Sequence, residues 1–182
     1  MDATPMIELA EACGGVLAGR GEGIAVERIS KDTRTLKPGD LYWALSGENF
    51  DGHSFVGAAV RAGACGAVVG SDVADVPEGF PLVRVADTQS ALHRLAAWHR
   101  ARLKARVVCL TGSNGKTSTK DFTAAVAATR FAVNKTEGNF NNHLGLPLTI
   151  LTARTTDEVC VWEIGMNRPG EIGVLSSLAR PD

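Results

Sequence analysis

A glycine-rich segment, Thr111-Gly112-Ser113-Asn114-Gly115-Lys116-Thr117-Ser118, carries the residue types that bind a phosphate chain. Glycines let the backbone curl so that its N–H groups point inward, and a helix that follows presents its positive end to the anion. Lys116 can reach the β- and γ-phosphates, and the Thr117 hydroxyl can ligate Mg²⁺. The longer pattern G-x-x-x-x-G-K-[ST] needs glycine where this chain has Leu110, so the sequence contains only the shorter form G-x-x-G-K-T. An apolar stretch before the segment and a helical pattern after it favour a nucleotide phosphate loop over an ordinary glycine-rich turn.

Glu163 is the second residue that could do chemistry, because it ends the apolar run Val159-Cys160-Val161-Trp162. A carboxylate at that end of a parallel strand faces the same sheet edge as the phosphate loop. Mg²⁺ needs oxygen ligands there in addition to the Thr117 hydroxyl. We therefore expect Thr117 and Glu163 to be metal ligands, with a surface glutamate at a strand end as the alternative.

An unusually polar loop runs from Lys135 to Pro147 and contains Asn139, Asn141 and Asn142. Asparagines cap helices and hold left-handed turns, so a capped connection would explain them. Three asparagines within four residues could equally orient phosphates or a substrate carboxylate. The residues alone leave both interpretations open.

A polar cluster in the first half of the chain begins with Ser30-Lys31-Asp32-Thr33-Arg34 and continues from Pro38 to Phe55. Arg34 could pair with a phosphate or a carboxylate. Salt-bridged turns would account for this cluster about as well as a ligand site.

The elements that must hold the phosphate loop follow a β-α-β rhythm. The apolar run 107–110 predicts a strand buried on both faces. We expect a helix over 117–129, strands over 131–134 and 159–164, and a helix over 169–179. This order predicts a parallel sheet with ligand loops at the carboxyl ends of its strands.

The first half of the chain predicts a separate small α/β unit. We expect helices over 6–13, 54–62 and 87–103, and extended segments at 24–29, 41–45, 66–69 and 82–85. The last of these helices ends in basic residues, which we interpret as a solvated helix end and linker: Arg100, Arg102, Lys104 and Arg106. The chain is therefore expected to be α/β throughout, with domains over 1–104 and 105–182.

Composition excludes several classes of protein. Nineteen Lys and Arg residues against 20 Asp and Glu residues give a net charge of −1, so no basic surface for nucleic acid or anionic membrane is predicted. No apolar run is long enough to span a membrane, and the acidic amino end is unlike a secretory signal, so we expect a cytoplasmic protein without membrane insertion. The four cysteines and four histidines lack metal-ligand spacing, and a structural metal is not predicted.

Taken together, these segments resemble the Mur ligase family. Asp32 to Phe55 resembles the family's D-[ST]-R…P-G-D-L-[FY]-x-A-L-x-G-E…D-G-H-x-F segment, and the glycine-rich segment resembles its ATP loop. Residues 138–147 resemble G-N-x-N-N-x-x-G-x-P, and residues 163–172 resemble E-[MI]-G-x-x-x-x-G-E-I. The asparagine loop favours the branch that joins D-alanyl-D-alanine to UDP-N-acetylmuramoyl-tripeptide over the branch acting one step earlier, whose loop is rich in threonine and proline.

The resemblance implies an ATP-dependent amide ligase of peptidoglycan precursor synthesis. ATP would phosphorylate the tripeptide carboxylate, and the amine of D-alanyl-D-alanine would attack the acyl phosphate. Lys116, Asn139 and Glu163 would be the catalytic residues, and Asn142 a further residue for positioning phosphate or metal-bound water. ATP would contact Gly112, Ser113, Asn114, Gly115, Lys116, Thr117 and Ser118, with Mg²⁺ on Thr117 and Glu163. The UDP-sugar would contact Ser30, Asp32, Thr33 and Arg34.

The chain departs from the family in length. Relatives continue through a complete central domain, which contains a carbamylated lysine and a metal-assisting histidine, and then a third domain. We therefore expect a monomeric fragment, with an incomplete ATP-binding domain, that cannot complete the ligation alone. The alternatives are a different Mur-type ligase acting on a shorter UDP-muramyl peptide, and a non-catalytic nucleotide-binding module.

Overall fold

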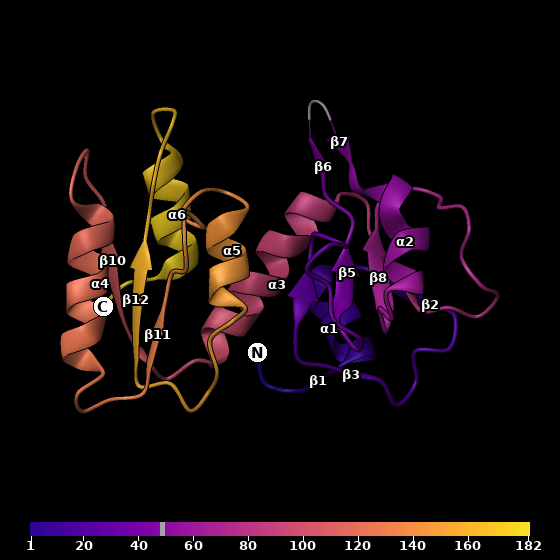
Figure 1. Ribbon diagram of the computed structural model, residues 1–182, viewed down its shortest axis with the longest axis horizontal. Helices are drawn as coiled ribbons and strands as arrows, with labels where there is room; N and C mark the ends of the chain where they lie inside the picture. Colours follow the sequence, from indigo (N-terminus) through magenta and orange to yellow (C-terminus); the bar gives the residue numbers. More distant parts are fainter. Residues whose placement is uncertain (48–49) are drawn as a thin grey trace. The chain divides into compact units, whose positions relative to one another are not determined.

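The computed structural model describes residues 1–47 and 50–182, so Glu48 and Asn49, which belong to the family-like segment 32–55, lie outside the described residues. The chain divides into two compact units, Asp2–Leu95 and Ala96–Asp182, the second of which also includes Met1. Each unit is a mixed α/β structure containing parallel strands, as the sequence predicts (Figure 1). The division lies within helix α3 (Thr88–Arg102), whereas the sequence predicts a domain boundary after residue 104.

The amino-terminal unit is built on a five-stranded sheet with the order β2-β9-β8-β5-β4. Strands β4, β5, β8 and β9 run parallel, and β2 pairs antiparallel with β9. Before α3, the elements of this unit are β1 (Thr4–Pro5), α1 (Met6–Cys13), β2 (Val16–Ala18), β3 (Ala25–Val26), β4 (Ile29–Ser30), β5 (Leu41–Trp43), β6 (Ser46–Gly47), β7 (Phe50–Asp51), a 3₁₀ turn (Gly52–Phe55), α2 (Val56–Arg61), β8 (Gly66–Val69) and β9 (Leu82–Arg84).

The apolar runs of β5 and β8 explain why these two strands lie in the middle of the sheet. Every residue of both strands is buried, which requires cover on both faces. In the register of the sheet, Leu41 lies opposite Gly66 and Trp43 opposite Val68. The Trp43 indole N–H donates to the carbonyl of Thr88 at 2.9 Å, so this large side chain is buried without an unsatisfied polar atom.

The carboxyl-terminal unit has a parallel sheet of order β10-β12-β11, in which Leu110 lies opposite Glu163. Helix α4 packs on strands β11 and β12, whereas α5 and α6 pack on the other side of the sheet and against each other (Figure 1). The elements are β10 (Arg106–Leu110), α4 (Lys116–Ala127), β11 (Val133–Lys135), α5 (Gly145–Ile150), β12 (Val159–Glu163) and α6 (Glu171–Ala179).

The predicted strand over 131–134 begins later than expected, at Val133. The N–H of Phe131 donates to the carbonyl of Ala127 at 2.9 Å, so the turn that ends α4 includes the first residues of that apolar run. Among the described residues, four short strands were not predicted: β1, β2 and the hairpin strands β6 and β7.

The prediction of a solvated helix end is wrong for Arg100, which is buried. Its Nε donates to the Ala179 carbonyl at 2.6 Å, and its Nη2 donates to the Arg180 carbonyl at 2.7 Å. The last carbonyls of a helix have no partner within the helix, and Arg100 satisfies those at the end of α6.

Candidate functional site

The glycine-rich loop joins β10 to α4 and is exposed over residues 111–115. Gly112 has φ 141° and Gly115 has φ 76°, conformations that a side chain would oppose. Gly115 precedes the first residue of α4, and no side chain caps that helix, so its first N–H groups face the loop. The loop therefore has the backbone geometry of an anion site.

The predicted ATP-binding residues fall in two groups. Lys116 lies in the first turn of α4, and its Nζ donates to the carbonyl of Gly112 at 2.5 Å, so its ammonium lies across the loop. The loop itself contains Gly112, Ser113, Asn114 and Gly115, and the first turn of the helix contains Lys116, Thr117 and Ser118.

Thr117 and Glu163 are brought together by the fold. The Thr117 hydroxyl donates to Glu163 Oε2 at 2.8 Å. Glu163 is the last residue of β12 and is only 3% exposed, and its backbone N–H donates to the Thr136 hydroxyl at 2.9 Å. A hydroxyl and a buried carboxylate thus lie at the same edge of the sheet as the phosphate loop.

Asn141 is a contact of Glu163 that the sequence analysis did not single out. Its side-chain Nδ2 donates to Glu163 Oε1 at 2.7 Å, and its carbonyl accepts the Gly165 N–H at 2.8 Å. A Cβ on Gly165 would lie 3.0 to 3.1 Å from the Asn141 amide, so the glycine gives this side chain room. The polarity of the loop predicted a role for this region, but the residue types alone do not distinguish Asn141 from the neighbouring asparagines.

The other two asparagines lie elsewhere in the loop. Asn142 Oδ1 accepts the N–H groups of Leu144 at 3.1 Å and Gly145 at 2.8 Å, at the start of α5, which is the capping role left open above. Asn139 is exposed, and its carbonyl accepts the Asn141 N–H at 2.8 Å. The structure thus brings Asn141, and neither of these two side chains, into hydrogen-bond contact with Glu163.

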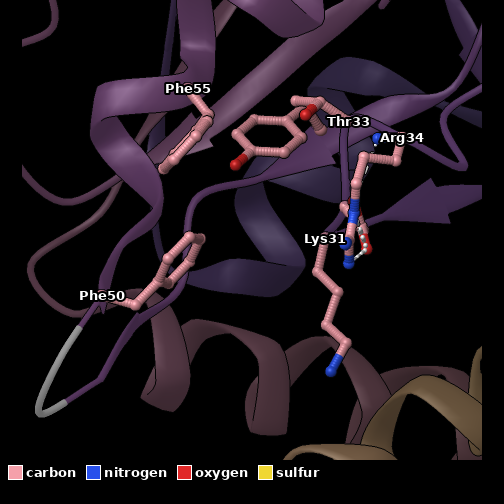
Figure 2. Close-up of a pocket in the computed structure, with 7 residues that line it drawn as sticks. Lys31, Thr33, Arg34, Phe50 and Phe55 are labelled. Carbon is pink, nitrogen blue, oxygen red and sulfur yellow. Dashed lines mark hydrogen bonds and ion pairs between the residues drawn. The ribbon is translucent and has the colours of Figure 1, made fainter.

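In the amino-terminal unit, the residues after β4 line a cleft of about 490 Å³. Figure 2 shows Lys31, Thr33 and Arg34 on one side of it and Phe50 and Phe55 on the other. The lining residues are Lys31, Asp32, Thr33, Arg34, Tyr42, Phe50 and Phe55.

Asp32 and Arg34 form a close ion pair at the edge of this cleft. Arg34 Nη2 lies 2.6 Å from Asp32 Oδ2, and the Arg34 backbone N–H donates to Asp32 Oδ1 at 2.9 Å. These hydrogen bonds from Arg34 lower the pKa of Asp32 to about 2. Ser30 is buried and donates to the Asp32 carbonyl at 3.0 Å, so it shapes the turn beneath the cleft. The pair gives the cleft a fixed guanidinium with an exposed outer face.

The aromatic side of the cleft was not predicted from the sequence. The Phe50 and Phe55 rings stack with centroids 5.2 Å apart and an angle of 21° between their planes. Tyr42 is buried and donates its hydroxyl proton to the Gly52 carbonyl at 3.0 Å, and burial raises its pKa to about 12. Exposed stacked rings opposite two cationic side chains suit a ligand that combines a flat ring with negative charge.

His53 holds the segment that carries the two phenylalanines. Its Nε2 accepts the Gly70 N–H at 2.8 Å, which leaves the ring proton on Nδ1, 2.6 Å from Asp51 Oδ1. The hydrogen bonds from His53 lower the pKa of Asp51 to about 2. This network fixes the turn between Phe50 and Phe55.

Within residues 1–47 and 50–182, no group of three or more His, Cys, Asp or Glu side chains could hold a metal ion by itself. Magnesium bound to a nucleotide commonly needs only one or two carboxylates, because phosphates and water supply its other ligands. Among those same residues, no helix has the length and apolar character needed to cross a membrane.

Comparison with protein families gives two matches that together span most of the chain. Residues 25–100 match the Mur ligase family, catalytic domain, and residues 110–182 match the Mur ligase middle domain.

Curated relatives with high similarity are named UDP-N-acetylmuramoyl-tripeptide–D-alanyl-D-alanine ligase. The Bacillus subtilis protein is 45% identical over 96% of the chain, and the Escherichia coli protein is 41% identical over the whole chain. The chain spans 38% and 39% of the length of these two relatives.

Solved structures of MurF proteins are also similar to the chain. A MurF structure from Acinetobacter baumannii matches 98% of the chain with a TM-score of 0.87 and 33% identity, and the chain covers 39% of its length. MurF from Thermotoga maritima in complex with ADP matches 86% of the chain with a TM-score of 0.73 and 32% identity, and the chain covers 36% of its length.

Proposed function

The chain belongs to the Mur ligase family, and we propose that it supplies the substrate-binding and phosphate-binding parts of a ligase joining D-alanyl-D-alanine to UDP-N-acetylmuramoyl-tripeptide. The observation that carries this proposal is the contact between Thr117 and Glu163 beside the glycine-rich loop. It supports a site for a metal-bound nucleotide, and the names of the relatives supply the rest of the reaction. In this proposal, residues 1–104 hold the UDP-sugar, and residues 105–182 form the first part of the ATP-binding domain.

ATP would bind with its phosphates on the loop. The first N–H groups of α4 offer the positive end of a helix, and the Lys116 ammonium would move from the Gly112 carbonyl to the β- and γ-phosphate oxygens. Lys116 would then offset the negative charge of the phosphoryl group during transfer.

Thr117 and Glu163 fit a magnesium ion by the chemistry of their donors. Both offer hard oxygen atoms, which Mg²⁺ prefers, and Glu163 is a buried carboxylate whose charge a cation would balance. When bound, the ion would shield negative charge on the ATP phosphates. Asn141 would keep the Glu163 carboxylate oriented, and Asn139, on the same loop, is our remaining candidate for contacting phosphate or substrate.

The cleft of the amino-terminal unit would hold the UDP part of the second substrate. Lys31 and Arg34 would pair with the diphosphate, and the stacked rings of Phe50 and Phe55 offer a surface for a planar base. Asp32 holds Arg34 in place, while Thr33 and the buried Ser30 complete the turn. We further propose that the ligase works in the cytoplasm as a monomer.

Calorimetric titration of the chain with UDP-N-acetylmuramoyl-tripeptide tests the proposal, with the dipeptide form and plain UDP as controls. We expect binding that prefers the tripeptide. Preference for the dipeptide form would support a ligase acting one step earlier. Absence of binding to all three by a chain that circular dichroism shows to be folded would contradict the substrate assignment.

A further inference from the structure

A buried lysine lies one turn beyond the phosphate loop on helix α4. Lys120 is 2% exposed, and its Nζ donates to the carbonyl of Thr136 at 2.8 Å. The carboxylate of Asp121 lies 3.3 Å from the same Nζ and also accepts a hydrogen bond from Lys135 at 2.8 Å. Burying an ammonium group is costly unless it is paired and hydrogen-bonded, and an apolar residue would fill the same volume without that cost. The role proposed above for Lys116 does not explain this second lysine.

Thr136 connects Lys120 to Glu163. It follows β11, is fully buried, and donates its N–H to the Val161 carbonyl of β12 at 3.2 Å. Its carbonyl accepts the lysine proton, and its hydroxyl accepts the backbone N–H of Glu163 at 2.9 Å. One residue thus links the helix to the backbone of the predicted metal ligand.

Helix α4 consequently holds Glu163 at two points. Thr117 contacts the carboxylate directly, while Lys120 supports the Glu163 backbone through Thr136. Thr117 and Lys120 are three residues apart and therefore lie on neighbouring turns of one helix face. Two attachments to one rigid helix fix the separation between the Thr117 hydroxyl and the Glu163 carboxylate more strictly than either attachment alone.

We propose that Lys120 and Thr136 are positioning residues that hold the Glu163 carboxylate at the distance from Thr117 that a nucleotide-bound metal requires. This inference rests on the proposed function, because it assumes that Thr117 and Glu163 share a magnesium ion. Residues that orient metal ligands typically change metal affinity about 10- to 100-fold when they are replaced. A lysine that only anchored the helix would change stability without changing the effect of the metal.

The test compares ATP affinity of the 182-residue chain in magnesium with its affinity in a chelator, by calorimetry. The measured quantity is the dissociation constant for ATP in the chelator divided by the dissociation constant in magnesium. The variants are Lys120→Met and Thr136→Val, which remove the two hydrogen bonds, and Thr136→Ser, which keeps the hydroxyl. Lys135→Met is the matched control, because the Lys135 side chain shares Asp121 with Lys120, whereas the Thr136 carbonyl accepts its hydrogen bond from Lys120.

We expect the ratio to fall about tenfold in Lys120→Met and Thr136→Val. Thr136→Ser and Lys135→Met should stay within about twofold of the unmodified chain, because both variants keep the hydrogen bonds that join Lys120 to residue 136 and residue 136 to Glu163. Circular dichroism establishes that each variant is folded. Should Lys120→Met fail to fold, Thr136→Val decides the matter, because valine keeps the shape of threonine.

Two outcomes would overturn the proposal, and they are distinguishable. If the unmodified chain binds ATP more tightly with magnesium and the folded Lys120→Met and Thr136→Val variants keep the same ratio, the positioning role is wrong and the proposed function stands. If magnesium has no effect on ATP binding by the unmodified chain, the metal site itself is wrong, and the positioning role fails with it.

Discussion

The Thr117 hydroxyl lies 2.8 Å from the Glu163 carboxylate, although 46 residues separate them in the sequence. Thr117 lies in the first turn of α4, the helix after β10, and Glu163 ends β12, the parallel neighbour of β10 in the sheet. Parallel strands have their carboxyl ends at the same edge of the sheet. The loop that follows one strand therefore lies beside the last residue of the neighbouring strand. The contact therefore follows directly from the topology.

Replacing Glu163 with glutamine should remove the effect of magnesium on ATP binding. An amide keeps the shape of the side chain but is a much poorer ligand for Mg²⁺ than a carboxylate. We expect magnesium-dependent ATP affinity to fall about tenfold or more. Calorimetry with and without magnesium measures this, and unchanged UDP-sugar binding serves as the control. A Glu163→Gln chain that responds to magnesium like the unmodified chain would remove Glu163 from the metal site.

Lys116→Ala should weaken ATP binding and leave UDP-sugar binding intact, because the two ligands are assigned to different units of the chain. Loss of a hydrogen bond to a charged partner typically costs about 1.5–3 kcal/mol, roughly 10- to 150-fold in affinity. Titration with each ligand measures both effects. Lys104→Ala, at an exposed lysine outside the loop, is the matched control. Simultaneous loss of both ligands in a folded Lys116→Ala chain would contradict the assignment of the two sites.

The parts of this fold that were predictable from the sequence are those whose residues repeat a physical pattern. The strands β8 and β12 are nearly continuous apolar runs, and their burial in parallel sheets follows from that composition. The prediction of burial on both faces is wrong for β10, because this strand lies at the edge of its sheet, where Val107 is buried and Val108 is exposed. The two-residue strands β6 and β7 are too short to carry any periodicity. They pair with each other in a local hairpin, with Ser46 opposite Asp51 and Gly47 opposite Phe50, and apolar alternation does not mark either strand.

The same distinction applies to side chains. Arg100 was expected in solvent because it lies in a basic run. It is instead buried and donates hydrogen bonds to carbonyls at the end of α6, about 80 residues later in the chain. Asn141 is one of three asparagines in the same loop. Its amide reaches Glu163 in space that a side chain at Gly165 would crowd. Partners that are distant in sequence decide both cases.

The ion pair of Asp32 and Arg34 predicts a specific titration. The pKa of Asp32 is lowered from 3.8 to about 2, so the pair's contribution is complete above about pH 4 and is lost as the pH falls through about 2. Arg34→Met should return the pKa of Asp32 toward 3.8, measured by NMR of the carboxyl carbons. Asp51 is an internal control, because His53 holds its pKa at about 2 independently of Arg34. An Asp32 pKa that does not rise in Arg34→Met would contradict the pairing.

Two glycines should respond oppositely to alanine. A Cβ on Gly145 would lie 2.4 Å from Phe140 Cα, so Gly145→Ala must displace the asparagine loop and should destabilise the fold by about 1–3 kcal/mol. Gly173 lies within α6 with nothing near its Cβ position, and Gly173→Ala should stabilise by about 0.5–1 kcal/mol. Urea unfolding measures both changes. Equal effects of the two substitutions would mean that the close approach of Phe140 to Gly145 is absent in solution.

Asn141 and Asn142 are adjacent residues of one loop, yet their replacement by alanine should have different consequences. Asn142→Ala removes the acceptor for two N–H groups at the start of α5 and should cost about 1 kcal/mol of stability. Because the Asn142 side chain caps α5 and the hydrogen bond to Glu163 comes from Asn141, the response of ATP binding to magnesium should be unchanged.

Asn141→Ala removes the donor to Glu163 Oε1 and leaves that carboxylate held by Thr117 alone among its side-chain donors in the described residues. The magnesium response should then fall about tenfold, as expected when a group that orients a metal ligand is lost. Unfolding and calorimetric measurements on both variants separate the two effects. If Asn142→Ala weakened the magnesium response and Asn141→Ala did not, the functional asparagine would be Asn142, and the contact of Asn141 with Glu163 would be structural.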